Sequence, residues 1–208
     1  MTRVISGIAG SLRLEVPKSG TRPTSDRVRE AIFSALASWG LTEGCRVLDL
    51  YAGSGALGLE AASRGASEVV LVEKNPGAAQ VAGRNARTVL GAFAQAGSSA
   101  GSAPRIEVVR QSVQSYLDGV RSGLRDREPL WDAVLLDPPY DLGETELTAN
   151  LAALVPLVAA DGVVLVERSG RSPEPTWPDG LALLREKRYG ETALWWAEPS
   201  AAVHPAAP

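Results

Sequence analysis

From residue 45 onward, short apolar runs alternate with segments in which apolar residues recur at helical spacing. The runs are too short for buried helices and are rich in valine and leucine, which favours strands. Five strands are predicted in this way, at 46–50, 68–73, 106–110, 133–137 and 163–167. Strands that alternate with helices are typical of βαβ units, so the pattern predicts a parallel sheet.

Caps and helix breakers define four helices between these strands. One begins at a glycine-rich turn after the first strand and stops at Gly65, and the next has Asn75 as its N-cap and Pro76 at its first position. Two more are predicted near 113–120 and 146–159.

The two ends of the chain depart from this alternation. Residues 3–16 predict a small β-hairpin, and an amphipathic helix follows that is capped by Thr24 or Ser25 and ends at Gly40. An antiparallel hairpin is predicted to close the sheet at 181–187 and 192–197.

These elements predict an α/β fold: a doubly wound, mostly parallel Rossmann-like sheet with a C-terminal antiparallel hairpin and a small N-terminal hairpin plus helix extension. A chain of 208 residues has room for one good core but not for a large second domain. The expected parts are an extension at 1–40, a core at 41–197 and a disordered tail at 198–208, with a flexible surface loop at 94–104.

The composition excludes several kinds of catalytic and metal sites. The one cysteine, Cys45, and the one histidine, His204, exclude an internal disulfide, a multi-cysteine zinc site and Ser-His-Asp catalysis, and we expect no metal. The chemistry must therefore rest on carboxylates, backbone groups or a cofactor. No apolar run approaches the length of a membrane span, and the N-terminus does not resemble a signal peptide, so we expect a cytoplasmic protein.

Charge is unevenly distributed. The net charge is −3, yet the first thirty residues hold six basic side chains against three acidic ones. Such a segment is either a solvated surface or a face that contacts phosphates, and charge alone does not decide between them. The basic residues are Arg3, Arg13, Lys18, Arg22, Arg27 and Arg29.

The turn after the first strand carries the features of a nucleotide site. Gly53 and Gly55 allow the backbone to approach a ligand, and Glu73, at the end of the next strand, suits a ribose diol. With Gly58 the glycines also match the dinucleotide fingerprint, so NAD and FAD are alternatives. Asp49 at the end of the first strand would repel a pyrophosphate but attract the ammonium and sulfonium charges of S-adenosylmethionine, and it favours that cofactor.

The fourth strand ends in a motif that indicates methyl transfer to an amine. It is Asp137-Pro138-Pro139-Tyr140, on the side of the sheet where α/β proteins bind ligands. The Asp137 carboxylate and the Pro138 carbonyl can each accept one N–H of an exocyclic amine, Pro139 stiffens the loop, and Tyr140 offers a ring for stacking. As the nitrogen gains positive charge, the carboxylate stabilises the transition state. The alternative is a Pro-Pro turn with an aspartate cap.

These motifs and the segment 22–33 resemble the RsmD-like ribosomal RNA guanine-N2 methyltransferases, within the class I methyltransferases, over nearly the whole chain to about residue 197. The resemblance implies methylation of a guanine amine in small-subunit (16S) ribosomal RNA. It implies that the loop 137–140 holds the amine and that Asp49, Gly53, Gly55 and Glu73 bind S-adenosylmethionine, to which we add Tyr51, Lys74 and Ser112. One departure concerns Gln111-Ser112, where many class I enzymes have an acidic residue for the adenine.

The motif at 137–140 indicates the type of reaction more clearly than it indicates the substrate, because DNA adenine-N6 and protein glutamine methyltransferases use the same arrangement. The chain has no room for a domain that reads DNA sequence, whereas a shaped RNA with a flipped base can be held through its backbone. We therefore expect ribosomal RNA or an assembling small subunit as partner of a monomeric enzyme, with the basic N-terminal residues binding RNA. Cytosine-C5 methylation would need a cysteine in the active loop, and Cys45 lies elsewhere. A dinucleotide-dependent oxidoreductase and a non-catalytic nucleotide-binding module are the other classes considered.

Overall fold

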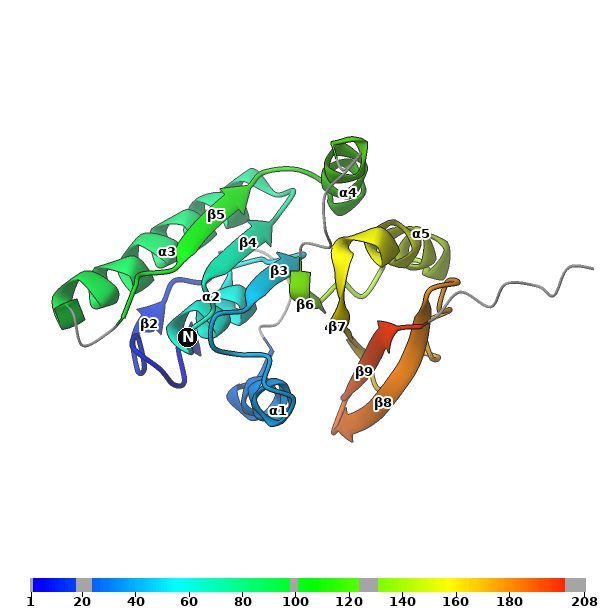
Figure 1. Ribbon diagram of the computed structural model, residues 1–208, viewed down its shortest axis with the longest axis horizontal. Helices are drawn as coiled ribbons and strands as arrows, with labels where there is room; N and C mark the ends of the chain where they lie inside the picture. The colour runs from blue at the N-terminus through cyan, green and yellow to red at the C-terminus, as the bar shows by residue number, and fades with distance from the viewer. Residues whose placement is uncertain (1, 18–23, 98–100, 124–130, 201–208) are drawn as a thin grey trace, which may run out of the picture.

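The computed structural model describes residues 2–17, 24–97, 101–123 and 131–200. Its centre is a seven-stranded sheet in the order β5-β4-β3-β6-β7-β9-β8, in which β9 runs antiparallel to both β7 and β8 and the other pairs are parallel (Figure 1). The strands are β3 (Arg46–Leu50), β4 (Glu68–Val72), β5 (Arg105–Val109), β6 (Trp131–Leu136), β7 (Val158–Ser169), β8 (Leu181–Tyr189) and β9 (Thr192–Pro199). The predicted fold class, including the closing hairpin, is confirmed.

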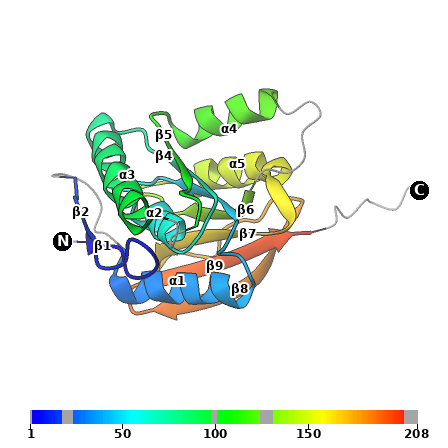
Figure 2. The same ribbon diagram turned by 60° about the vertical axis from the view of Figure 1, so that its left-hand side comes forward.

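Helices cover both faces of this sheet because the parallel strands are apolar on both sides. Two apolar clusters result: Leu135 and Trp196 belong to the one under α1 to α3, whereas Leu136 and Trp195 belong to the one under α4 and α5. In Figure 2, α4 and α5 lie on one side of β6 and β7, and α1 lies on the other. The helices are α1 (Asp26–Ser38), α2 (Ala56–Ser63), α3 (Pro76–Ala96), α4 (Val113–Ser122) and α5 (Glu144–Leu154).

The chain order reverses between β3 and β6. From β3 the sheet is built outward to β4 and β5, and the chain then returns to place β6 on the other side of β3. In open α/β sheets, ligands bind at such a switch point, outside the carboxyl ends of the strands. Leu50 pairs with Leu136, so Asp49 and Asp137 come from adjacent strand ends.

Several predicted boundaries are wrong. Helix α3 continues to Ala96, so only the later part of 94–104 can be a loop, and 98–100 lie outside the described residues. The helix predicted to reach residue 159 ends at Leu154, because a short 3-10 turn that contains Pro156 follows at Val155–Leu157. Strand β7 already starts at Val158, opposite Trp131. Strand β9 runs to Pro199, so the predicted tail begins too early, and its residues 201–208 lie outside the described part of the chain.

The N-terminal extension packs against α2. Its hairpin contains only the short strands β1 (Thr2–Arg3) and β2 (Arg13–Leu14). Glu60, fully buried on α2, accepts hydrogen bonds from the backbone of Ile5 (2.6 Å) and Ser6 (3.0 Å). A Cβ on Gly7 would lie 1.8 Å from the carbonyl oxygen of Ser63, so only glycine permits this approach.

Helix α1 begins as predicted but differs on its buried face. Ser25 is the N-cap, and its hydroxyl accepts from the backbone of Val28. The predicted RNA contact Arg29 is instead fully buried: its guanidinium donates to the carbonyl of Arg3 and to Asp26, each at 2.7 Å. Helical spacing places Arg29 on the same buried face of α1 as Ile32 and Phe33. Its long apolar stem packs there while its guanidinium reaches the two acceptors. The expectation that Arg29 contacts RNA is therefore wrong.

Candidate active site

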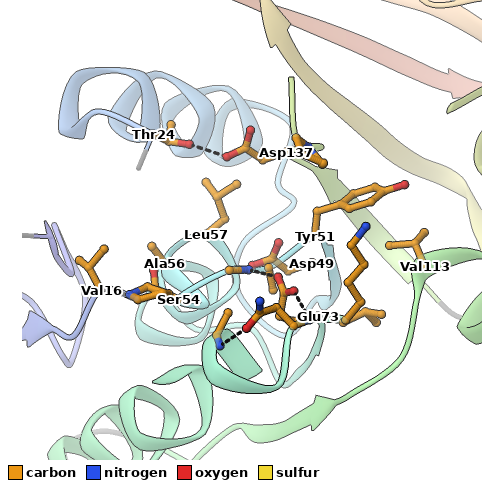
Figure 3. Close-up of a pocket in the computed structure, with 18 residues that line it drawn as sticks. Val16, Thr24, Asp49, Tyr51, Ser54, Ala56, Leu57, Glu73, Val113 and Asp137 are labelled. Atoms are coloured by element: carbon orange, nitrogen blue, oxygen red, sulfur yellow. Dashed lines mark hydrogen bonds between the residues drawn. The ribbon is translucent and has the colours of Figure 1, made fainter. Parts of the chain in front are cut away.

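A cavity of about 270 Å³ opens at the carboxyl ends of β3, β4 and β6, where the switch point lies (Figure 3). It brings Asp49, Tyr51, Gly53, Glu73 and Lys74 from the expected cofactor residues together with Asp137 and Pro139 of the expected amine-holding loop. The N-terminal segment closes one side through Val16, Pro17 and Thr24. The remaining lining residues are Ala52, Ser54, Ala56, Leu57, Val72, Asn75, Ala78 and Val113.

The glycine turn after β3 has left-handed geometry at three positions. The φ angles of Tyr51, Gly53 and Gly55 are 63°, 55° and 80°, a conformation that favours glycine at the last two positions. Gly55 does not line the cavity. A Cβ there would meet the side chain of Leu71 at 2.9 Å, so this glycine lets α2 pack closely on β4.

Asp49 is a buried carboxyl group that can accept a further hydrogen bond. It is 1% exposed, and its Oδ2 accepts from the backbone of Gly58 at 2.8 Å. Within the described part of the chain, its Oδ1 has no hydrogen-bond partner. Burial above all, with a smaller contribution from the nearby carboxylates of Asp137 and Glu73, raises the pKa of Asp49 to about 8, although the hydrogen bond from Gly58 lowers it. A cationic group in the cavity would favour the ionised form of this side chain.

Glu73 is fixed by backbone donors at the next strand end. Its Oε2 accepts from Gly53 at 2.9 Å and its Oε1 from Asn75 at 2.6 Å (Figure 3). Each carboxylate oxygen retains a second lone pair that can accept from a ligand hydroxyl. Asn75 also caps α3 as predicted, by accepting from Gly77 and Ala78.

Two other expected cofactor residues form hydrogen bonds within the protein. Ser112 does not line the larger cavity, and its hydroxyl caps α4 by accepting from the backbone of Ser115. The next residue, Val113, lines the cavity. Tyr51 lines the cavity, and its hydroxyl is hydrogen-bonded to Asn150 of α5. Burial raises the pKa of Tyr51, so this phenol stays neutral.

The loop after β6 separates the cavity from a second, smaller pocket. Asp137 and Pro139 line both, whereas Pro138 and Tyr140 line only the smaller one. The Tyr140 side chain is free for stacking, since the residue is 73% exposed. The Asp137 side chain thus lies between the larger cavity and the exposed ring of Tyr140.

Two residues of this site were not assigned from the sequence. The hydroxyl of Thr24 lies 3.1 Å from Oδ2 of Asp137 and 3.1 Å from Oε2 of Glu167. Burial raises the pKa of both carboxyl groups, and the charge of Asp137 raises that of Glu167 further. Thr24 was considered only as a helix cap and Glu167 only as a strand end, and no motif connects positions so distant in sequence.

The remaining basic candidates are only partly described. Arg3, Arg13 and Arg27 are exposed, and Arg3 forms an ion pair with Asp26. Lys18 and Arg22 lie outside the described residues. Among the residues that the structure describes, no helix is long and apolar enough to cross a membrane, and no group of three or more His, Cys, Asp or Glu side chains could hold a metal ion.

The sheet order, the cavity at the switch point and the loop at residues 137–140 define a class I methyltransferase fold. Among solved structures, the putative methyltransferase YhhF from Escherichia coli is similar with a TM-score of 0.74 and 30% identity, over 95% of this chain and 97% of that one. The magnesium protoporphyrin IX methyltransferase from Synechocystis, solved with bound S-adenosylmethionine, shares the fold at a TM-score of 0.60 and 16% identity, over 87% of each chain.

The chain belongs to the RsmD-like family. The family model described as "Conserved hypothetical protein 95" matches residues 2–198. The ribosomal RNA small subunit methyltransferase D of Escherichia coli is 35% identical over 92% of this chain and 86% of its own length. The putative rRNA methyltransferase YlbH of Bacillus subtilis is 31% identical over 92% of this chain and 96% of its own.

Proposed function

We propose that this protein transfers a methyl group from S-adenosylmethionine to the exocyclic N2 amine of a guanine in small-subunit ribosomal RNA. The observation that carries the proposal is that Asp49 and Asp137, from adjacent strand ends, open onto one cavity. The relatives named as methyltransferases of small-subunit ribosomal RNA support the substrate class. We further propose that the enzyme is monomeric and cytoplasmic, and that its partner is the RNA or an assembling small subunit.

The residues of the larger cavity fit S-adenosylmethionine. The unpartnered Oδ1 of Asp49 can accept from an ammonium group and lies in a dry site, where opposite charges attract more strongly than in water. The Glu73 carboxylate can accept from a ribose diol, and Gly53 leaves the backbone open to close approach. When bound, the cofactor supplies an electrophilic methyl group. A pyrophosphate in this position would face Asp49 and Glu73, which disfavours a dinucleotide.

In this proposal, the loop 137–140 binds and orients the amine. The Asp137 carboxylate and the Pro138 carbonyl hold its two N–H groups, so that the nitrogen lone pair points along the line of transfer. The charge of Asp137 stabilises the positive charge that develops on the nitrogen as the N–C bond forms and the S–C bond breaks. One N–H proton then passes from the methylated nitrogen to the Asp137 carboxylate that holds it, which leaves a neutral secondary amine. Tyr140 stacks on the base.

The proposal is tested by supplying radiolabelled methyl donor and purified protein to ribosomal RNA, DNA and protein from a strain that lacks the enzyme. We expect label in small-subunit ribosomal RNA and, after digestion, in N2-methylguanosine. Label in N6-methyladenine of DNA or in protein glutamine would favour the alternative substrates. Calorimetry with NAD is the control for the cofactor: tight NAD binding would contradict the methyltransferase assignment.

The exposed Arg13 and Arg27 are proposed to contact RNA phosphates, together with Arg3 and with Lys18 and Arg22 outside the described residues. We expect the double charge reversal of Arg13 and Arg27 to weaken RNA binding and to lower the slope of log affinity against log salt by roughly one to two. The matched control reverses Arg185 and Lys187 on β8, the strand at one edge of the sheet (Figure 1). Equal salt slopes for the two double variants would make the N-terminal charge an ordinary solvated surface.

A further inference from the structure

Glu167 is a buried carboxylate that the proposed transfer step does not use. It is 8% exposed and lies near the end of β7, the strand next to β6. Together with Asp137 and the loop 137–140, it lines the smaller pocket, on the side where a stacked base would lie. It is therefore placed to contact the acceptor rather than the methyl donor.

The pair formed by Asp137 and Glu167 has more acceptors than donors. The Thr24 hydroxyl lies 3.1 Å from an oxygen of each, but it has a single proton and can satisfy only one of them. Arg168 follows Glu167 in sequence, yet its guanidinium is bound to Glu144 at 2.6 Å and to the Leu142 carbonyl. In the described part of the chain, Thr24 is the one side chain that donates a hydrogen bond to this pair, although Arg168 and the hydroxyls of Ser169, Ser172 and Thr192 also line the pocket. The pocket therefore offers two neighbouring acceptors to a ligand.

Guanine matches such a pair better than adenine. Its Watson–Crick edge carries two adjacent donors, N1–H and the N2 amine, whereas adenine carries an amine next to the N1 acceptor. We propose that Glu167 accepts the N1–H of the target guanine while Asp137 accepts from the N2 amine, so that Glu167 makes the site selective for guanine. This inference rests on the proposed guanine-N2 transfer and deepens it. Glu167 can accept the N1–H in either protonation state, because a protonated carboxyl keeps one carbonyl oxygen, and ionisation makes both oxygens acceptors.

The test places 2-aminopurine at the guanine position that the wild-type enzyme labels. This base keeps the amine on C2 but has a lone pair at N1 where guanine has a hydrogen. For the wild type, we expect kcat/KM to fall by about 10²-fold or more with 2-aminopurine, since a site built to accept an N–H rejects an analogue that lacks it. In Glu167→Gln the side-chain amide can donate to N1, so we expect the preference for guanine to shrink at least tenfold.

A comparison of ratios makes the result specific. The missing O6 of 2-aminopurine affects wild type and variant alike and cancels. Glu167→Asp keeps an acceptor and is expected to retain the preference for guanine at a lower rate, so it tests the idea even if Glu167→Gln folds poorly. Glu186→Gln on the exposed face of β8 is the control for surface charge and should leave both substrates unchanged.

The failure of this inference differs from that of the proposed function. If Glu167→Gln lowered kcat/KM for guanine and 2-aminopurine by the same factor, Glu167 would not read N1, although guanine-N2 transfer would stand. Loss of the preference in Glu167→Asp, which keeps an acceptor, would have the same meaning. If the wild type formed no N2-methylguanosine in ribosomal RNA, both proposals would fall.

Discussion

Asp137→Ala is expected to lower the rate of methyl transfer by about 10² to 10³-fold, the usual cost of losing one preorganised partner of a developing charge. The physical reason is that the nitrogen is neutral in the ground state and positive in the transition state, so the carboxylate acts mainly on kcat. Single-turnover transfer to the RNA substrate measures the loss. Near-normal activity would exclude Asp137 from the reaction.

Cofactor binding and stability separate this loss from misfolding. We expect the calorimetric affinity of the Asp137→Ala variant for S-adenosylmethionine to stay near the wild-type value. Burial raises the pKa of Asp137, so its ionisation costs stability as the pH rises above the ordinary carboxyl value, and the variant should be at least as stable as wild type at pH 8. Asp141→Ala, an exposed aspartate in the same loop, is the matched control and should transfer normally.

Asp49→Asn is expected to weaken S-adenosylmethionine binding by roughly 30-fold or more, because truncating one partner of a buried charge pair costs about 2 to 5 kcal/mol. The amide oxygen can still accept from Gly58, so the glycine turn should keep its geometry. Titration calorimetry at pH 8 measures the difference. Equal affinities would show that Asp49 does not face the cation.

The pH dependence of binding provides a second readout. Because the pKa of Asp49 is raised to about 8 without ligand, the group is mostly protonated at neutral pH and must ionise to meet a cation. Affinity should therefore rise with pH up to about 8, with proton release that calorimetry in buffers of different ionisation enthalpy detects. The Asp49→Asn variant should lack this part of the dependence. Its ligand-free form should also be more stable than wild type at pH 8, since the cost of a buried ionised carboxyl is gone.

The sequence determined the strands and caps with useful accuracy where the signals were local. The strand at 46–50 was predicted at its observed bounds, and Ser25 and Asn75 cap their helices as expected. Apolar periodicity and capping chemistry act over a few neighbouring residues, so they can be read from the chain. Helix ends near Leu154 and Ala96 were misjudged, because there the competing interaction is a strand pairing or a helix extension that no local signal marks.

The positions of the candidate site residues were also predicted correctly only in part. Asp49, Glu73 and Asp137 were placed by one rule, that the carboxyl ends of neighbouring parallel strands meet at one edge, and they do line one cavity. Ser112 and Gly55 were assigned to the ligand by their positions in the motif, but the structure uses them for capping and close packing.

The sequence by itself thus determined the fold class and which strand ends place acidic side chains at one cavity, because both follow from short-range pattern and topology. Only the tertiary structure decided the surroundings of those groups: that Arg29 is buried, that Asp49 is buried with an oxygen that no described residue contacts by a hydrogen bond, and that Thr24 joins Asp137 to Glu167. Burial and pairing depend on residues more than a hundred positions apart in the last case, and long-range packing alone brings them together.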